Sequence, residues 1–349
     1  MTIGKENGSA GAAPALSEGG KRSREGAILS RSGEQGAALL TAMIIVALIA
    51  TLSASMLWQQ WRAVQVEAAE RARTQSAWIL SGALDWARLI LREDARNGGT
   101  DHLGEPWAVP LAEARLSTFL AADKNNTEDA PDAFLSGAIT DAQARFNLAN
   151  VVNGNSIDKL GMATLQRLCE TVGVSADVAA RLAAGLRDAT PPAPGASAAS
   201  AAATAPADPP LMPRSVRQLA WFGIDPEAVR ALEPYVVILP VQTAVNANTA
   251  SREVLVATIE GLDLATAERM VQSRQRVPFK SRADVQALAP SLPADSFVKV
   301  DVNSSFFEVR GRLRLNDVVL EQRSLVQRRG LAVEVLQRER IASRDPVRS

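Results

Sequence analysis

One uninterrupted apolar stretch constrains this chain more than any other feature. Residues 37–57 read AALLTAMIIVALIATLSASML and contain no charged side chain. As a helix of about 21 residues, at about 1.5 Å per residue, the stretch would be about 31 Å long. That length matches the hydrocarbon core of a bilayer, which is about 30 Å thick. The sequence therefore predicts a single transmembrane helix at 37–57.

The segment before this stretch is polar and basic. It carries Lys5, Lys21, Arg22, Arg24 and Arg31. By the positive-inside rule, residues 1–36 stay in the cytoplasm and the rest of the chain crosses the membrane. A secretory signal peptide has its cleavage site after the apolar region. In this chain the only evident cleavage point is Gly36, which directly precedes the apolar stretch.

This arrangement resembles the class III signal of type IV pilins and type II secretion pseudopilins. The resemblance implies that prepilin peptidase cuts between Gly36 and Ala37, leaves the apolar helix on the mature chain and methylates the new terminus. Most members have glutamate at the fifth mature position, where this chain has Thr41. The subfamily known for lacking that glutamate is minor pseudopilin K of the type II secretion system. From this segment alone, an ordinary single-span anchor stays open.

Composition argues against several functions. The chain has 38 basic and 38 acidic residues, so no overall field attracts nucleic acid. A single histidine, His102, excludes multi-histidine metal sites and HExxH zincins. The sequence also lacks Walker A, G-x-G-x-x-G and G-x-S-x-G motifs. The one cysteine, Cys169, lies in a helical apolar pattern and is expected to be a buried small hydrophobe. We therefore expect no catalytic activity.

Helical spacing of apolar residues continues after the predicted span. The stripe consists of Leu57, Trp61, Val64, Ala68, Ala72, Ile79, Ala83, Trp86 and Ile90. Because no proline occurs from Ala37 to Glu105, we expect one rod helix over 37–97 that ends near Asn97-Gly98-Gly99.

Strand patterns lie near the middle and at the end of the chain. Residues 139–151 indicate short strand pieces around a turn, and from Val309 apolar residues alternate with arginines. Two further strand-like segments follow, so the tail predicts three antiparallel strands in a meander. The tail arginines are expected on a solvated face of that sheet.

Between these regions, the period is helical throughout residues 156–293. A glycine, an apolar residue, a short polar step and an amphipathic helix recur three times, beginning at Gly173, Gly223 and Gly261. The glycines supply a positive φ, and three residues are expected to cap the following helices: Ser175, Asp225 and Asp263. The Pro/Ala-rich residues 190–210 are expected to form a disordered loop.

Three motifs resemble pseudopilin K closely: D-x-L-G-E-x-W-A at Asp101–Ala108, I-x-D-x-x-x-R-F-N-L at Ile139–Leu148, and NANTASREVL at 246–255. The resemblance implies an α+β fold, with a pilin-like long N-terminal helix packed on an antiparallel sheet. It also implies a large inserted all-α domain of helix-hairpin-helix or SAM-like type. The implied domains are the removed leader at 1–36, the rod at 37–97, the pilin-like domain at 98–150 and 297–345, and the insert at 151–296.

The same resemblance implies a function without catalysis. A minor pseudopilin would stand at the tip of the periplasmic pseudopilus and act in starting or controlling its assembly, for export of folded proteins across the outer membrane. Implied partners are minor pseudopilins of types I and J, the major pseudopilin, prepilin peptidase and the inner-membrane assembly platform, with type H left open. The location would be the bacterial inner membrane, single-pass, with the C-terminal bulk in the periplasm.

Residues 246–279 also resemble helix-hairpin-helix modules of DNA-uptake receptors, which bind phosphate through a G-x-G turn at a helix N-terminus. Here the turn reads Gly261-Leu262-Asp263 and puts a carboxylate where the phosphate would sit. We therefore expect no nucleic-acid binding. A membrane-tethered DNA-binding or DNA-uptake protein and a minor type IV pilin remain the alternatives.

Calcium is a separate question, because calcium sites occur in the family that the chain resembles. Carboxylates of the type that Ca²⁺ prefers cluster at Asp123, Asp129 and Asp132. They do not follow the EF-hand pattern, so no ligand set is assigned. No cofactor is implied beyond this candidate.

Overall fold

The computed structural model describes residues 31–116, 133–191, 209–315 and 318–341, with side chains from residue 36 on. The candidate calcium residues at 123–132, nearly all of the predicted loop at 190–210 and the leader before Arg31 lie outside the described residues. The chain divides into two compact units, residues 1–70 and 71–349, and each is described by itself.

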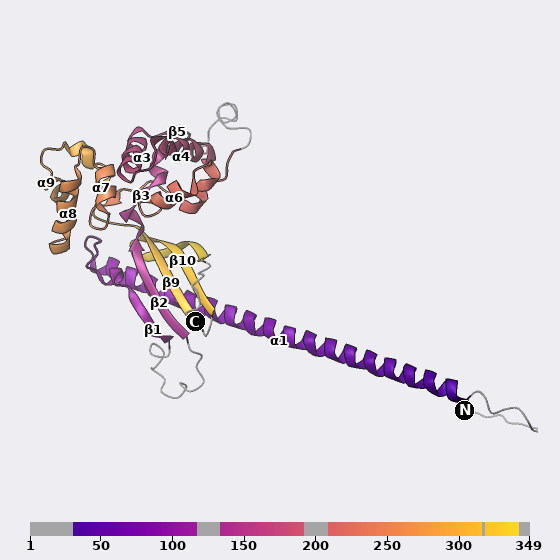
Figure 1. Cartoon of the computed structure of the whole chain (residues 1–349). Helices are drawn as coiled ribbons and strands as arrows, with labels where there is room; N and C mark the ends of the chain where they lie inside the picture. Colours follow the sequence, from indigo (N-terminus) through magenta and orange to yellow (C-terminus); the bar gives the residue numbers. More distant parts are fainter. Residues whose placement is uncertain (1–30, 117–132, 192–208, 316–317, 342–349) are drawn as a thin grey trace, which may run out of the picture. The chain divides into compact units, whose positions relative to one another are not determined.

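A single helix, α1, runs from Arg31 to Asn97 and confirms the long N-terminal helix (Figure 1). It ends where predicted, before Gly98, which has a φ of 68°. It already includes Arg31, the first described residue, and so extends at least six residues before the predicted start at Ala37. Glycine lowers helix propensity by about 1 kcal/mol without removing a hydrogen-bond donor, so Gly33 and Gly36 do not stop the helix.

In the second unit, one face of α1 packs on the sheet. Its buried residues are Ser76, Leu80, Leu84, Ala87 and Leu91. The predicted stripe is displaced from this face, since Trp86 is 51% exposed. Apolar side chains occupy two faces of this part of the helix, and periodicity alone does not tell which face meets the sheet.

The sheet has five antiparallel strands in the order β1-β2-β9-β10-β11 (Figure 1). The strands are β1 Leu111–Arg115, β2 Ala133–Asp141, β9 Phe306–Leu315, β10 Val318–Arg329 and β11 Ala332–Ile341. The meander predicted for the tail is confirmed by β9, β10 and β11. Strands from far apart in the sequence thus meet, because β2 pairs with β9.

The two faces of β9 differ in chemistry. Phe307, Val309 and Leu313 are buried on the α1 side, and the Phe307 ring meets the Trp107 ring edge-on at 5.2 Å. The opposite face carries Glu308 and the arginines, as the alternation predicted. Glu308 is paired there with three guanidinium groups, those of Arg145, Arg310 and Arg323.

Two facing glycines lie in tight places of the sheet, and one of them, Gly311, lies against α1. Gly137 of β2 stands opposite Gly311 of β9. A Cβ atom on Gly311 would lie 3.2 Å from Leu80 of α1, and one on Gly137 would lie 2.9 Å from the Arg310 carbonyl oxygen. A larger residue at either position would force the helix or the strand to shift.

A helical block lies between β2 and β9 in the sequence and beside the end of the sheet where these strands meet it (Figure 1). Its helices are α3 Lys159–Thr171, α4 Ala176–Ala189, α6 Pro226–Leu232, α7 Arg252–Thr258, α8 Leu264–Arg276 and α9 Arg282–Ala287. The second unit also contains short 3-10 helices. They are η1 Pro106–Ala108, η2 Ala142–Ala144, η3 Leu148–Val151, η4 Val216–Phe222 and η5 Ala294–Phe297. The block has one continuous hydrophobic core.

The three predicted hairpin glycines all have a positive φ. Asp225 and Asp263 cap α6 and α8 as predicted, accepting from the Glu227 and Thr266 amides. Ser175 stands at the N-cap position of α4, but its side chain makes no capping hydrogen bond. Its hydroxyl donates to the Asp177 carboxylate instead of accepting from the helix, because that charged acceptor is the stronger partner.

The prediction of helical period throughout 156–293 is also wrong in places. Two-residue strands stitch the block together: β4 Val152–Asn153 with β5 Ser156–Ile157, β3 Phe146–Asn147 with β6 Val236–Val237, and β7 Val245–Asn246 with β8 Val300–Asp301. Pairs this short are set by tertiary contacts, so they leave no periodic signal in the sequence.

Gly161→Ala should destabilise the block. A Cβ at this position would lie 2.0 Å from the Asn150 carbonyl oxygen, which belongs to the backbone and cannot rotate away. We expect the free energy of unfolding to fall by ~1–3 kcal/mol or more, measured by urea denaturation of the detergent-solubilised chain. Gly82→Ala on α1 is the control. No atom lies within 4 Å of its Cβ position, so it should be neutral or stabilising by up to ~1 kcal/mol. Equal effects of the two substitutions would contradict the close packing at Gly161.

Candidate functional site

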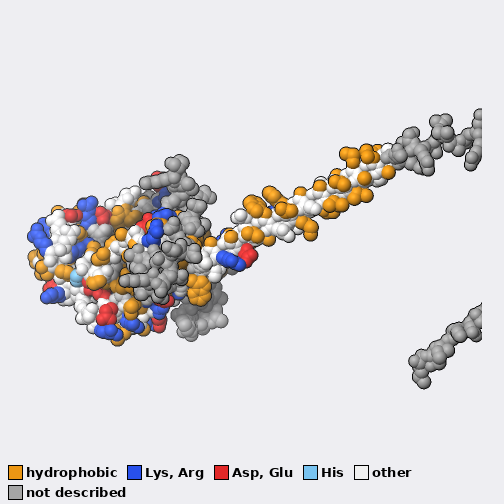
Figure 2. All heavy atoms as spheres, turned by 90° about the horizontal axis from the view of Figure 1, so that it is seen from below, with side chains coloured by type: hydrophobic (Ala, Val, Ile, Leu, Met, Phe, Trp, Pro, Cys, Tyr) orange, Lys and Arg blue, Asp and Glu red, His pale blue; other side chains and the backbone are white. Residues whose placement is uncertain are grey.

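The first half of α1 is an apolar surface without cover inside its own unit (Figure 2). Its exposed large apolar side chains are Leu39, Leu40, Met43, Ile44, Ile45, Val46, Leu48, Ile49, Leu52, Met56, Leu57, Trp58, Trp61, Val64 and Val66. Among the described residues, α1 is the one helix long and apolar enough to cross a membrane. A surface of this kind requires a lipid or protein environment.

The three residues predicted for processing and assembly all lie at the start of this surface. Gly36 and Ala37 are within α1, and no atom lies within 4 Å of the Cβ position of Gly36. The Thr41 hydroxyl lies 3.1 Å from the Ala37 carbonyl oxygen and 2.9 Å from that of Ala38. It donates back into its own helix, so this turn presents neither a charge nor an unpaired donor to a neighbour.

A second group of polar residues joins the sheet to the helical block. At its centre is Asp141, the last residue of β2, which is only 4% exposed. Its carboxylate accepts from the Gln143 amide, Asn246 Nδ2, Thr249 Oγ1 and Ser304 Oγ, at distances of 2.6–2.9 Å. Burial raises the pKa of Asp141, and these hydrogen bonds oppose the rise. The three side-chain donors come from the block and from the segment that leads into β9.

The NANTAS motif supplies much of this junction. Asn246 Nδ2 also donates to the Asp101 carbonyl oxygen at 3.0 Å. The Asn248 side chain pairs with both backbone groups of Phe279, donating to its carbonyl oxygen and accepting from its amide. Ser251 caps α7. The motif that suggested a DNA-binding module therefore holds the block together and fastens it to the sheet.

The motif at Ile139–Leu148 acts in the same way. Asn147 Nδ2 donates to the Val241 carbonyl oxygen at 2.7 Å, and its Oδ1 accepts from the Leu239 amide at 3.1 Å. Gln143 Nε2 donates to the Ala244 carbonyl oxygen, and the Gln143 Oε1 accepts from the Ser305 amide. Both side chains thus bind backbone groups that lie about a hundred residues or more away in the sequence. The periodicity of the sequence does not predict such contacts.

An ion-pair network closes the C-terminal end of α1. Arg328 of β10 donates to Asp94 of α1 at 2.6 Å and to Asp101 in the following loop at 2.5 Å. The same guanidinium donates to the Ser304 carbonyl oxygen and lies over the Phe307 ring. Only 12% of the Arg328 side chain is exposed, so solvent screens these contacts weakly.

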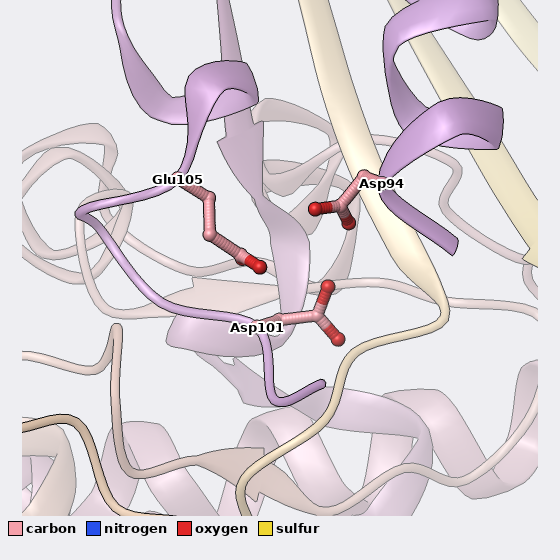
Figure 3. Close-up of side chains that lie close together, drawn as sticks. All are labelled: Asp94, Asp101 and Glu105. Carbon is pink, nitrogen blue, oxygen red and sulfur yellow. The ribbon is translucent and has the colours of Figure 1, made fainter. Parts of the chain in front are cut away.

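Glu105 completes the network as a third carboxylate (Figure 3). It accepts from the His102 amide at 2.9 Å and from Trp107 Nε1 at 2.7 Å. Burial is the main cause that raises the pKa of Glu105 to about 7, and the neighbouring Asp94 adds to the rise. Burial also raises the pKa of Asp101, against the opposing effect of Arg328.

The three carboxylates Asp94, Asp101 and Glu105 place oxygen atoms within 4.8 Å of one another. Two of them already bind the Arg328 guanidinium, which supplies the positive charge that a metal ion would bring. Among the described residues, this cluster is arranged as an ion-pair network around Arg328. The predicted calcium residues Asp123, Asp129 and Asp132 lie outside the described residues, and the sequence motifs did not indicate this cluster.

Asp263 opposes the alternative of phosphate binding at the hairpin turn. Its carboxylate accepts from the Thr266 amide at 2.9 Å and from the Thr266 hydroxyl at 2.6 Å. Both hydrogen bonds lower the pKa of Asp263, so a negative charge stands at the N-terminus of α8. A phosphate at this turn would meet a carboxylate that already occupies the helix N-terminus.

Neither His102 nor Cys169 has the setting of a catalytic group. His102 Nδ1 accepts a hydrogen bond from the Gly104 amide at 3.1 Å. The ring nitrogen thus stabilises its own loop. Cys169 is buried as predicted, and burial raises the pKa of its thiol to about 11. The thiol therefore stays protonated at neutral pH and is a poor nucleophile.

Comparisons with known proteins agree on one family. Two models described as "Type II secretion system (T2SS), protein K" match residues 144–241 and 245–303. The type II secretion system protein K of Pseudomonas aeruginosa is 29% identical over 88% of this chain and 90% of its own length. That of Pectobacterium carotovorum is 28% identical over 88% of this chain and 97% of its own length.

A solved structure has the same fold. It comes from the crystal structure of the GspK–GspI–GspJ complex of enterotoxigenic Escherichia coli, with a TM-score of 0.61 and 20% identity. The likeness covers 79% of this chain and 99% of that one.

A long N-terminal helix with an uncovered apolar half, followed by a sheet that carries a helical block, is the architecture of a membrane-anchored pseudopilin. The chain is accordingly similar to the type II secretion system protein K family.

Glu105→Gln should flatten the pH dependence of stability. The folded chain holds a proton on Glu105 above the ordinary pKa of 4.5, up to about 7. This contribution to stability is therefore present at low pH and is lost as the pH rises through about 7. Glutamine keeps the acceptor for Trp107 and has no proton to lose. We expect a smaller drop in melting temperature between about pH 5 and about pH 8 than in the unmodified chain.

The control for this prediction is Glu93→Gln, which removes an exposed carboxylate of α1 beside Arg96. It should keep the pH dependence of the unmodified chain. If Glu105→Gln and the unmodified chain lose the same number of degrees, Glu105 is not held protonated in the folded state.

Proposed function

We propose that this chain is the minor pseudopilin at the tip of the periplasmic pseudopilus, where it starts or controls assembly of the fibre. The fibre would help to export folded proteins across the outer membrane. The chain would be anchored in the bacterial inner membrane, with residues after the span in the periplasm. It would work through assembly and not through catalysis.

The observation that carries this proposal is the combination of an uncovered apolar helix with a block mounted on the sheet. The helix offers a surface for the membrane and for other pilin-type helices. The block, fixed to the sheet through Asp141, would obstruct a subunit stacking above it. A subunit of this kind can end a fibre but is poorly suited to its interior.

Thr41 gives independent support for a terminal position. A carboxylate at this place would neutralise the terminal amine of a mature pilin helix inside an apolar bundle, where an unpaired ion costs several kcal/mol. Thr41 has no charge, and its hydroxyl already bonds to its own helix. The chain therefore lacks the group that repeated addition would use.

The proposed partners are minor pseudopilins of types I and J, because the related GspK occurs in a complex with GspI and GspJ. Contacts with the type H and major pseudopilins, prepilin peptidase and the inner-membrane assembly platform are part of the same proposal. These contacts would use α1 and the sheet, which leaves the helical block outward.

We expect the mature chain to begin at Ala37. Mass spectrometry of the membrane-extracted protein should show the loss of residues 1–36 and a methylated amine in cells with active prepilin peptidase. Gly36→Val should block this processing, because a side chain would occupy the cleavage point. Gly33→Val, three residues earlier on the same helix, should be processed normally. An intact Met1 terminus in the unmodified chain would overturn the assignment of the leader.

The tip position is tested by immunogold labelling of overproduced pseudopili. Label should be found at one end of each fibre, and types I and J should be co-isolated with the chain from detergent extracts. Thr41→Glu should keep the end location, because the block still obstructs stacking. Even labelling along the fibre would refute the tip position.

A further inference from the structure

Trp58 and Trp61 stand out on the uncovered half of α1. They are the first aromatic residues of the chain, since residues 1–57 contain none. Their rings lie 5.7 Å apart at 35°, and the two side chains are 60% and 57% exposed. In the described part of the chain, neither indole nitrogen has a hydrogen-bond partner. The pair therefore offers two large apolar rings and two unused donors to its surroundings.

The position of the pair follows from the length of the span. Trp58 comes directly after residues 37–57, which cover about 31 Å at about 1.5 Å per residue. This places it at the far boundary of a hydrocarbon core about 30 Å thick. The next side chains, Gln59, Gln60 and Arg62, are polar or charged, so the helix leaves the hydrocarbon here. Trp61 is one turn further on and lies on the same face.

We propose that Trp58 and Trp61 form an interfacial anchor that binds the headgroup layer of the bilayer on the side of the C-terminal bulk. An indole ring suits this layer because its apolar body stays near the acyl chains while its N–H reaches ester or phosphate oxygens. The inference rests on the membrane-anchored part of the proposed function and adds the lipid layer as partner of this pair.

The anchor is one-sided, because no aromatic residue stands at the Gly36 end of the span. Moving the helix outward, toward the bulk, takes the pair from the headgroups directly into water. Moving it inward would bring the indole donors and the Arg62 charge into hydrocarbon, where such groups are costly. The pair thus resists sinking of the helix into the hydrocarbon, at the end of the span that carries the C-terminal bulk.

The test measures the depth of the pair in vesicles. The full chain is reconstituted in phosphatidylcholine vesicles that contain lipids brominated either near the headgroup or at the acyl-chain ends. Bromine quenches nearby tryptophans, and the chain has six. Trp58→Phe/Trp61→Phe is compared with Trp78→Phe/Trp86→Phe, which removes two exposed tryptophans of the same helix outside the span.

Headgroup-proximal bromine should quench the unmodified chain and the Trp78/Trp86 variant, by up to the share of two tryptophans. It should leave the Trp58/Trp61 variant almost unquenched, and bromine at the chain ends should quench all three less. Stronger quenching from the chain ends would place the pair in the core and overturn the proposal. Absence of quenching, or equal quenching of both variants, would place the pair in water or against protein and overturn it too. Processing of the leader and the fibre position do not enter this readout, so failure here is distinct from failure of the proposed function.

Discussion

The buried carboxylate of Asp141 is the constraint on which the second unit depends. A charge or a polar group without partners in such a place costs several kcal/mol, so the residues that donate to it must stay where they are. Those residues come from the block, through Asn246 and Thr249, and from the approach to β9, through Ser304. Separating the block from the sheet would break the bonds from Asn246 and Thr249 together. The block is for this reason a fixed part of the subunit and not a tethered accessory.

Arg328 fixes the C-terminal end of α1 in a similar way. It ties the helix, through Asp94, to the loop at Asp101 and to β10, so the helix is fixed at its C-terminal end. The leucines of residues 71–97 then fill the face of the sheet, and Gly311 lets Leu80 of the helix approach it. The first half of α1 has no such partners in its own unit. The polar networks thus consolidate the second unit, while the first half of α1 keeps an uncovered apolar surface.

Sequence motifs located many of these residues without revealing their roles. Asp101, Glu105, Asp141, Asn147 and Asn246 all belong to motifs that marked the family resemblance. Asp101, Asp141, Asn147 and Asn246 make contacts across roughly a hundred residues or more of chain, which spacing along a helix or strand cannot express. Glu105 contacts its neighbours His102 and Trp107. Ser304 and Arg328 carried no signal of their own, because a serine in a loop and an arginine at a turn are common in any sequence. The Ser175 side chain makes no capping hydrogen bond for a local reason, since Asp177 competes for its hydroxyl.

By itself, the sequence determined the membrane-spanning helix, its end at Asn97, the tail meander and the glycine hairpins. These features follow from continuous hydrophobicity, from alternation, and from the freedom of glycine to take a positive φ, all of which act within a few residues. Only the tertiary structure decided which face of α1 meets the sheet, that β2 pairs with β9, and that two carboxylates, Asp94 and Asp101, share the Arg328 guanidinium. These outcomes depend on packing and on the cost of unpaired buried charge. Both arise only when distant parts of the chain exclude water from each other.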